Sequence, residues 1–384
     1  MRILMFSYDK NLVAGSPSGD ALQRHVSYAE HLDKLDIVIP LSAGKSPAEL
    51  KINEKLSIYP TGGFKIIAWL RAYLIARRIC RAGGVDIVVT QDALLGVPGY
   101  LLKREFGCRL QVNALGLEIF NDWWLKESLL HRVYKSIMCW TLRRADLVRT
   151  DATRAKTALM ERLRLSSERV AVIPIIPRPE NIAGFTDAYG DGVRNELLQG
   201  KYGRMVLFIG TLEKIKNIPN LLRAGKQVLS AHPGTMFVLI GAGPERDRLE
   251  KLSRELGIAD NVRFMGVVPY DDIPPYLAAC DIFILPSWSE GFPRVLLEAT
   301  FAAKPIVVTD INGAVDIVTD GESGYIVPLN DSAKLAEKIE ELLSNPEKAR
   351  EMGRRGYENT LKYRDFDSNV NVLVNLWQGM LVSK

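Results

Sequence analysis

The chain has 384 residues, of which 47% are hydrophobic and 25% are charged. These values are typical of a soluble globular protein of two or three domains, and they exclude a disordered chain, because so much apolar surface can offset the entropy lost on folding. Lys and Arg number 50 against 45 Asp and Glu, a net charge of +5, which is too small to predict a nucleic-acid partner.

The four cysteines lie far apart and form no CxxC pair, so we expect neither a zinc site nor a disulfide framework. A reducing cytoplasm fits this cysteine usage best. The apolar run at Met1–Phe6 is short and is followed by Asp9 and Lys10, which predicts a first strand and not a secretory signal. No stretch approaches the length of an uncharged membrane-spanning helix. We therefore expect a cytoplasmic protein.

Short β-branched runs alternate with amphipathic stretches through the first half of the chain. The predicted strands of this half are Ile3–Ser7, Asp36–Ile39, Asp86–Thr90, Leu110–Val112, Leu147–Thr150 and Val170–Ile173. Apolar residues spaced three and four apart predict helices at Ala21–Leu32, Lys65–Ala82, Ser128–Arg144 and Thr153–Leu163. Alternation of this kind favours α/β architecture with a parallel, doubly wound sheet.

The alternation stops around Pro174–Gly203, where prolines and glycines cluster. It resumes with predicted strands at Val206–Ile209, Phe237–Ile240, Val262–Phe264, Ile282–Leu285, Ile306–Val308 and Tyr325–Val327. We therefore predict two Rossmann-like domains, at 1–178 and 204–362, joined by a linker at 179–203. A C-terminal helix at about 363–384 is expected to pack back onto the first domain.

The segment Ser289–Ala299, SEGFPRVLLEA, combines charges with a predicted helix start. Pro293 would occupy the first turn, so the N–H groups of Arg294 and Val295 would form an anion site. Glu298 follows among apolar residues, where a carboxylate needs partners such as ribose hydroxyls. The alternative is an acidic residue favoured by the helix dipole, followed by a solvent-facing glutamate.

This Glu-x7-Glu segment, which follows a strand ending in Leu-Pro, resembles the retaining glycosyltransferases of the GT-B fold, in their GT4-like group. Further landmarks occur in the family's order: VLFIGTLEKIKN at Val206–Asn217, FVLIGAGP at Phe237–Pro244, VRFMGVV at Val262–Val268 and GESGYIVP at Gly321–Pro328. The resemblance covers about 205–345 strongly and the first half only weakly. It implies two Rossmann-like domains that face each other across a cleft. It also implies transfer of a hexosyl unit from a UDP- or GDP-sugar to a glycan or lipid-linked acceptor, in cell-surface polysaccharide or glycolipid synthesis.

The resemblance implies roles for individual residues as well. Glu290 would contact the donor sugar and stabilise its positive charge in the transition state, and Lys216 would neutralise the diphosphate leaving group. Glu298 would bind the ribose. The other implied donor contacts are the diphosphate-binding backbone of Phe292, Arg294 and Val295, the adjacent Gly291, Val268 at the nucleobase, and Gly19 after the first strand. No metal or other cofactor is expected, because the helix start and the lysine would supply the positive charge.

Two positions depart from the family's pattern. Thr211 stands where relatives usually have a diphosphate-binding arginine, and Asn113 stands where many have a histidine near the reacting centre. Asn113 can donate a hydrogen bond to a sugar hydroxyl but cannot take up a proton. His25 and Glu118 are further candidates for contact with the acceptor or sugar, and a structural role explains either residue at least as well. The two departures support one alternative, a non-catalytic nucleotide-sugar-binding partner of an active relative. A sugar-nucleotide epimerase of the same fold is a second alternative, against which the Glu-x7-Glu context and the missing histidine argue.

The predicted helix at Lys65–Ala82 combines aromatic and basic residues, among them Trp69, Arg71, Arg77 and Arg78. Such a helix can hold a protein at an anionic membrane surface. The alternative is a helix whose apolar face lies in the core and whose arginines are solvated. Membrane contact would make the protein peripheral on the inner face of the membrane and its acceptor lipid-linked.

Overall fold

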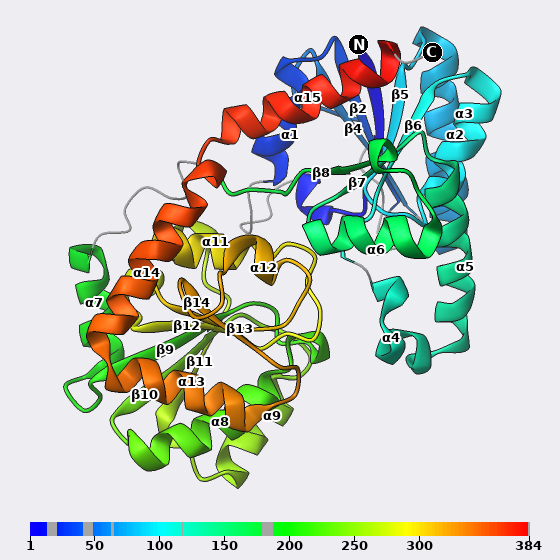
Figure 1. Ribbon diagram of the computed structural model, residues 1–384. Helices are drawn as coiled ribbons and strands as arrows, with labels where there is room; N and C mark the ends of the chain where they lie inside the picture. Colours follow the sequence, from blue (N-terminus) through cyan, green and yellow to red (C-terminus); the bar gives the residue numbers. More distant parts are fainter. Residues whose placement is uncertain (14–20, 41–48, 63–64, 117, 179–186, 383–384) are drawn as a thin grey trace. The chain divides into compact units, whose positions relative to one another are not determined.

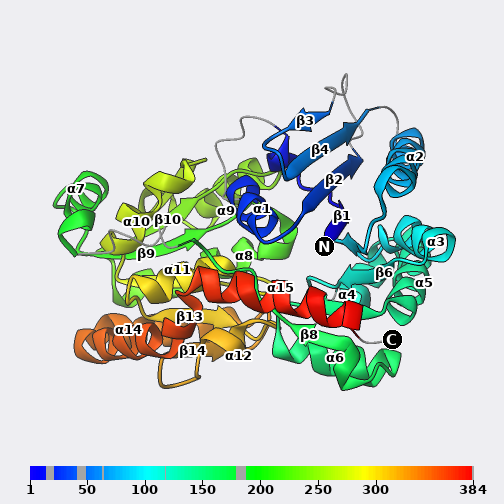
Figure 2. The same ribbon diagram turned by 90° about the horizontal axis from the view of Figure 1, so that it is seen from above.

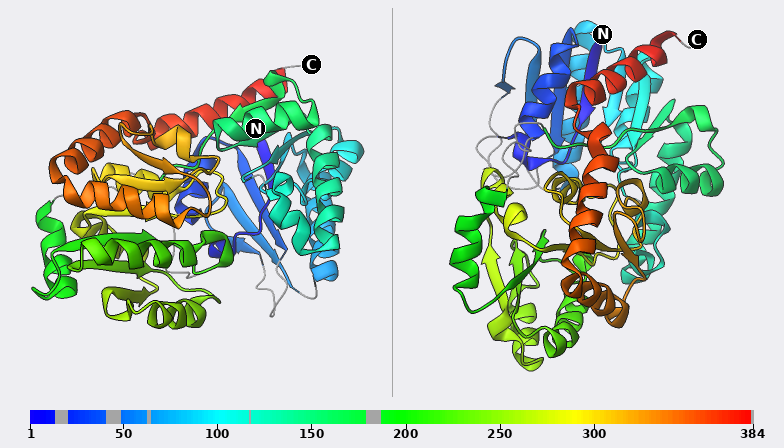
Figure 3. Two further views of the ribbon diagram at one scale, coloured as in Figure 1. Left: turned by 60° about the horizontal axis from the view of Figure 1, so that its bottom comes forward. Right: turned by 60° about the vertical axis from the view of Figure 1, so that its left-hand side comes forward.

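The computed structural model describes residues 1–13, 21–40, 49–62, 65–116, 118–178 and 187–382. The chain forms two compact units: unit 1 contains Met1–Pro174 and Asp367–Lys384, and unit 2 contains Ile175–Phe366. Each unit is a β-sheet with helices on both faces (Figure 1, Figure 2), and the further views in Figure 3 show the same layers. No helix in these ranges is long and apolar enough to cross a membrane.

Within the described residues, the sheet of unit 1 has eight strands in the order β3-β4-β2-β1-β5-β6-β7-β8. Its pairs are parallel except for the antiparallel pair of β3 and β4. The strands are β1 (Arg2–Phe6), β2 (Lys34–Pro40), β3 (Leu50–Lys51), β4 (Leu56–Thr61), β5 (Ile87–Thr90), β6 (Arg109–Asn113), β7 (Leu147–Thr150) and β8 (Val170–Val172).

Helices cover both faces of this sheet. One face carries α2, α3, α5 and α6, whose apolar side chains share one core with the strands. On the other face, the fully buried Trp377 of α15 donates its indole N–H to Gln111 of β6 at 2.9 Å and packs edge-on against Tyr28 of α1. The helices and 3₁₀ turns are η1 (Lys10–Leu12), α1 (Ala21–Glu30), α2 (Lys65–Gly83), α3 (Gly96–Phe106), η2 (Glu118–Phe120), α4 (Asp122–Glu127), α5 (Leu129–Arg144), α6 (Thr153–Leu163), η3 (Ser167–Arg169) and α15 (Phe366–Val382).

The sequence pattern does not predict α3 or β4, and packing explains both. A Cβ atom on Gly96 would lie 2.7 Å from that of Thr141, and one on Gly99 would lie 2.8 Å from Leu110 Cδ1. The glycines of α3 therefore allow the helix to approach its neighbours closely and do not mark a turn. Pro60 of β4 cannot donate a ladder hydrogen bond, which argues against a central strand. Strand β4 tolerates this proline because the neighbouring edge strand β3 is short and pairs only with Ser57 and Ile58.

The sheet of unit 2 is parallel, with its six described strands in the order β11-β10-β9-β12-β13-β14. They are β9 (Arg204–Ile209), β10 (Thr235–Ile240), β11 (Val262–Gly266), β12 (Ile282–Leu285), β13 (Ile306–Thr309) and β14 (Gly324–Val327). The helices and turns are α7 (Asp187–Leu198), η5 (Lys214–Lys216), α8 (Ile218–Ala231), α9 (Arg246–Glu255), η6 (Ala259–Asn261), η7 (Tyr270–Asp272), α10 (Pro274–Ala279), α11 (Arg294–Phe301), α12 (Ala314–Ile317), α13 (Ser332–Ser344), α14 (Pro346–Thr360) and η8 (Leu361–Tyr363).

The segment 179–203, expected to be a linker, contains α7, which packs on α10 within unit 2. A Cβ atom on Gly190 would collide with the backbone of Ala279. Arg194 donates to the carbonyl of Ala279 at 2.6 Å and pairs with Asp281 at 3.1 Å. Gly190, one of the glycines that suggest a linker, thus serves close packing of α7 against α10.

An ion-pair cluster on α13 and α14 gives a pH-dependent contribution to stability. Hydrogen bonds from Lys338, Lys348 and Tyr325 lower the pKa of Glu341 to about 2. Because this pKa lies below the unfolded value, the contribution is complete above about pH 4.5 and disappears as the pH falls towards 2. We expect Glu341→Gln to cost about 1 kcal/mol at pH 7, a value limited by solvent screening, and progressively less below pH 4.5. Urea unfolding at both pH values tests this.

The exposed pair of Lys251 and Glu255, whose charged atoms are 3.7 Å apart, provides the control. Glu255→Gln should change the unfolding free energy by less than about 0.5 kcal/mol at either pH. An equal cost of Glu341→Gln at neutral and acidic pH would contradict the assignment.

Candidate active site in unit 2

The loops at the carboxyl ends of β9 and β10 pack backbone against backbone. The N–H of Leu212 donates to the carbonyl of Ala242, and the N–H of Glu245 donates to the carbonyl of Leu212, both at 3.0 Å. Gly241 has a φ of 134°, and a Cβ atom there would collide with the carbonyl oxygen of Gly210. This close approach fixes the path of the loop that leads from β9 to η5.

We expect Gly241→Ala to destabilise the protein by about 1–3 kcal/mol, because alanine adds both a strained φ and a backbone collision. Gly257 is a matched control: its φ is 73°, and a Cβ atom added there would have nothing within 4 Å. Gly257→Ala adds the φ strain alone, so thermal unfolding should show a smaller loss. If both variants melt at the same temperature, the close approach does not constrain the loop.

Lys216 and Glu290 meet at this edge of the sheet, although they lie 74 residues apart. The Lys216 ammonium donates to Glu290 Oε1 at 2.5 Å, and the Ser287 hydroxyl donates to the same oxygen at 2.8 Å. A backbone bond from Trp288 to the carbonyl of Ile215, 2.8 Å long, joins their two loops. Both charged side chains are 18% exposed, so they are accessible to a ligand but partly shielded from water. The structure thus brings the two candidate catalytic residues into contact.

Helix α11 begins directly after the Glu290 loop. Pro293 is its N-cap residue, with φ −74° and ψ 98°, and the first-turn N–H groups of Arg294 and Val295 have no acceptor within the helix. Together with the helix dipole, these groups favour an anion. A Cβ atom on Gly313 would collide with the carbonyl oxygen of Gly291. The loop before α11 is therefore held closely against the start of α12.

Glu298 lies on α11 with only 5% of its surface exposed. The hydroxyl of Tyr270, on η7, donates to Glu298 Oε1 at 2.6 Å. Arg294 donates to the same hydroxyl at 3.4 Å, and its guanidinium lies over the Tyr270 ring, 5.9 Å from the centroid. Glu298 is therefore a buried, oriented carboxylate and not the solvent-facing one of the alternative interpretation. No pattern in the sequence distinguishes Tyr270 from an ordinary turn tyrosine.

The other donor-site candidates of unit 2 lie on the same loops. Thr211 is exposed between β9 and η5, and Val268 is half-buried between β11 and η7. Phe292 is buried and packs edge-on against Tyr363, with 5.5 Å between the ring centroids. Its ring therefore anchors the loop before α11, which leaves only its backbone available to a ligand.

Two candidates in unit 1 are buried. Asn113, at the end of β6, is 3% exposed and accepts a hydrogen bond from the side chain of Gln111 at 2.8 Å. His25 is 1% exposed, with Nδ1 2.7 Å from the carbonyl oxygen of Ala21 and Nε2 2.9 Å from the amide nitrogen of Gln91. This arrangement fits a neutral imidazole with its proton on Nδ1.

Two other candidates are not described. Gly19 lies outside the described residues, and of Glu118 only the backbone is described, at the start of η2. Among the residues that are described, no group of three or more His, Cys, Asp or Glu side chains could hold a metal ion. Burial raises the pKa of Cys80 and of Cys280 to about 12, so these thiols stay protonated near neutral pH.

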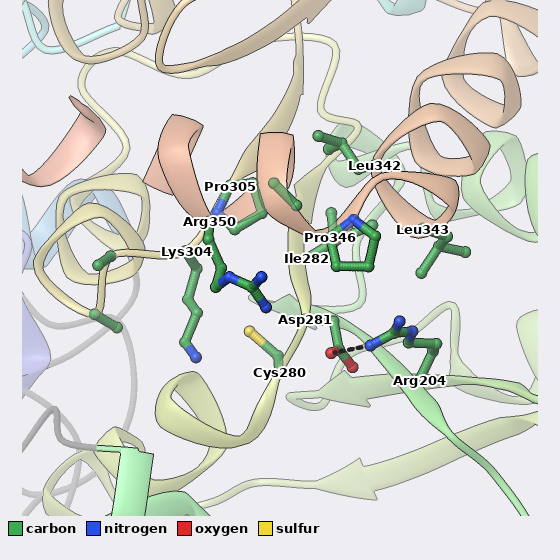
Figure 4. A pocket seen from close by; sticks show the side chains of 13 residues that line it. Arg204, Cys280, Asp281, Ile282, Lys304, Pro305, Leu342, Leu343, Pro346 and Arg350 are labelled. Carbon is green, nitrogen blue, oxygen red and sulfur yellow. Dashed lines mark hydrogen bonds and ion pairs between the residues drawn. The ribbon is translucent and has the colours of Figure 1, made fainter. Parts of the chain in front are cut away.

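A cavity of 320 Å³ lies elsewhere in unit 2 (Figure 4). Its lining includes Arg204, Ile282 and Pro305, at the amino ends of β9, β12 and β13, and Asp281, which pairs with Arg204 at 3.4 Å. The candidate catalytic residues follow the carboxyl ends of the strands, where ligands bind in such sheets. This cavity is therefore not part of the candidate active site.

Comparison with known proteins gives two family matches. Residues 193–359 match the model described as glycosyl transferases group 1, and residues 46–175 match the model described as glycosyl transferase 4-like domain. The chain is 30% identical to the D-inositol 3-phosphate glycosyltransferase of Acidothermus cellulolyticus over 330 residues, which cover 83% of this chain and 72% of that protein.

Solved structures show the same fold. The sucrose-phosphate synthase of Thermosynechococcus elongatus has a TM-score of 0.83 at 19% identity, with 100% of both chains covered. HepE of Anabaena, in complex with UDP-glucose, has a TM-score of 0.78 at 18% identity, with 99% of this chain and 100% of that chain covered. At such low identity, these likenesses establish the fold alone.

Proposed function

Because this chain belongs to the group 1 glycosyltransferases, and is therefore a transferase enzyme of the GT-B fold, we propose that it moves a hexosyl unit from a UDP- or GDP-sugar to a glycan or lipid-linked acceptor, with retention of configuration. This reaction would contribute to cell-surface polysaccharide or glycolipid synthesis. The observation that carries the proposal is the contact between Lys216 and Glu290 immediately before the start of α11. Binding of UDP-glucose by a protein of the same fold supports a nucleotide-sugar donor.

The proposed chemistry needs two kinds of charge stabilisation. Cleavage of the glycosyl–phosphate bond leaves negative charge on the diphosphate and creates oxocarbenium character in the sugar. Lys216 and the N–H groups at the start of α11 would stabilise the first, and the Glu290 carboxylate would stabilise the second. Because the lysine and the helix start supply positive charge, we propose that transfer requires no metal.

The nucleoside part of the donor would lie beside α11, near Glu298. Glu298 would accept hydrogen bonds from the ribose hydroxyls, with Tyr270 holding its carboxylate in place. Val268, which precedes η7, would contact the base. The non-catalytic alternative draws only on Thr211 and Asn113, and the absence of a histidine at position 113 argues against the epimerase. The Lys216–Glu290 contact favours transfer over both.

Nucleotide release tests this proposal. The protein should release UDP or GDP from one of UDP-glucose, UDP-galactose and GDP-mannose, slowly with water as acceptor and faster with a lipid or glycan extract. A metal chelator should leave the rate unchanged, and NMR should find the donor's anomeric configuration in the product. Release of neither nucleotide would contradict the proposed donors, an inverted product would contradict retention, and a chelator-sensitive rate would contradict metal independence.

A further inference from the structure

Positive charge is concentrated on three neighbouring helices of unit 1. Helices α2, α3 and α5 together contain eleven Lys and Arg residues and a single acidic residue, Glu105. Glu105 is already paired with Arg77 at 2.6 Å and with Arg81 at 3.4 Å. The whole chain has a net charge of only +5, so the remainder of the molecule is net negative. This face therefore has a charge unlike the rest of the protein.

The same three helices expose large apolar side chains. On α2, Ile67, Leu70 and Leu74 are spaced three and four residues apart, which places them on one side of the helix, and they are 45%, 58% and 51% exposed. Their neighbours on α3 and α5 are Leu101 at 46%, Leu129 at 77%, Leu130 at 51% and Val133 at 53%. An apolar surface that extends over several elements of a folded domain marks an interaction site.

A basic groove of 480 Å³ lies along α5 and α6. It is lined by Lys135, Arg143, Arg144 and Arg162, and its described lining contains no acidic residue. Aromatic side chains hold two of these cations: Arg144 lies 4.2 Å from the ring centroid of Trp140, and Arg162 lies 5.0 Å from that of Phe120. Such a groove fits a phosphate group.

The apolar and basic features adjoin each other on α5. Its amino-terminal half exposes Leu129 and Val133, and its carboxyl-terminal half contributes Arg143 and Arg144 to the groove. Helix α3 packs between α5 and α2 (Figure 1), so the three helices that carry these exposed side chains are neighbours in one layer of unit 1. Surfaces that lie in a membrane interface combine these same two features.

We propose that the α2–α3–α5 face of unit 1 docks on an anionic lipid surface, with lipid phosphates in the groove and the exposed aliphatic side chains at the acyl boundary. A second copy of the chain is a poorer partner, because two such basic faces repel each other. The phosphates of a nucleic acid would match the positive charge of this face, but they provide no apolar surface that could bury the exposed leucines. Docking here would bring the enzyme to a lipid-linked acceptor, a consequence that depends on the proposed function, whereas docking itself does not.

Flotation of the full chain with vesicles tests the proposal. We expect binding to phosphatidylcholine vesicles that contain phosphatidylglycerol, much weaker binding to phosphatidylcholine alone, and a loss of binding at high salt. The double variant Arg143→Gln/Arg144→Gln should weaken binding about thirtyfold, because each cation near the surface raises the affinity roughly five- to sixfold and the two factors multiply. Leu129→Ser/Val133→Ser should weaken it by about tenfold or more, through lost apolar burial.

Matched variants on other surfaces serve as controls. Arg223→Gln/Lys226→Gln removes two exposed cations from α8, and Val372→Ser/Val382→Ser removes two exposed valines from α15. Both should bind vesicles like the parent protein, and UDP and GDP titrations should be unchanged in all four variants, which separates docking from the donor site. Equal binding to both vesicle types, binding to neither, or equal losses in test and control variants would overturn the proposal.

Discussion

Replacement of Glu290 by glutamine is expected to lower kcat for nucleotide release by about a hundred- to a thousandfold. Glutamine keeps the shape of the side chain and can still accept the hydrogen bond from Ser287, but it removes the negative charge that opposes the developing oxocarbenium ion. A loss of this size is typical when one preorganised charge-stabilising group is removed. Affinity for the free nucleotide should stay equal or rise. Lys216 loses its carboxylate partner in this variant, so its ammonium group is fully available to the diphosphate. Nucleotide release and calorimetry measure the two quantities separately.

The contact between Lys216 and Glu290 provides the internal control. Lys216→Met should also lower kcat strongly, and the double variant should lose less than the sum of the two free-energy effects, because residues that act as one unit are not additive. Lys214→Met changes an exposed lysine of the same turn and should stay within about threefold of the parent. Full activity in Glu290→Gln would contradict a role for Glu290 in the reaction.

Glu298→Ala is expected to weaken binding of the accepted nucleotide by about thirty- to a hundredfold, with little change in kcat at saturating donor. The variant loses hydrogen bonds between a buried carboxylate and the ribose, each worth about 1.5–3 kcal/mol when one partner is charged. Calorimetric titration of the variant and the parent protein gives the difference directly.

Pyrophosphate distinguishes a ribose contact from a general loss of structure. It contains the diphosphate without the ribose, so Glu298→Ala should bind it as the parent protein does. Tyr270→Phe removes only the hydroxyl that orients Glu298 and should weaken nucleotide binding by a few fold. Unchanged nucleotide affinity in Glu298→Ala, or equal losses of nucleotide and pyrophosphate affinity, would contradict the ribose assignment.

Strand positions could be predicted from the sequence because buried parallel strands are continuous β-branched runs. The predicted strand Ile282–Leu285 is β12, and Val206–Ile209 lies within β9. The predicted start of α11 depends on Pro293, a strong local signal, and the structure places the helix directly after it. In contrast, α3 begins with a sequence typical of a turn, and only its close packing against Thr141 and Leu110 explains its glycines.

The geometry of the site depends on contacts that local patterns do not encode. Lys216 meets Glu290 because a backbone hydrogen bond joins the loops after β9 and β12, and no spacing along the chain reveals that bond. Tyr270 reaches Glu298 from a 3₁₀ turn without any distinctive motif. His25 has the sequence context of a surface helix, yet its partners Ala21 and Gln91 enclose it in unit 1.

The central claim is that the start of α11, with Lys216, binds the diphosphate of a sugar nucleotide. Calorimetric titration of the full chain with UDP, GDP and the corresponding monophosphates, in the presence of a metal chelator, tests it most directly. We expect saturable binding of one diphosphate, at least about tenfold tighter than its monophosphate, because the second phosphate adds charge-assisted hydrogen bonds. Binding of neither diphosphate, or equal affinity for diphosphate and monophosphate, would contradict the claim.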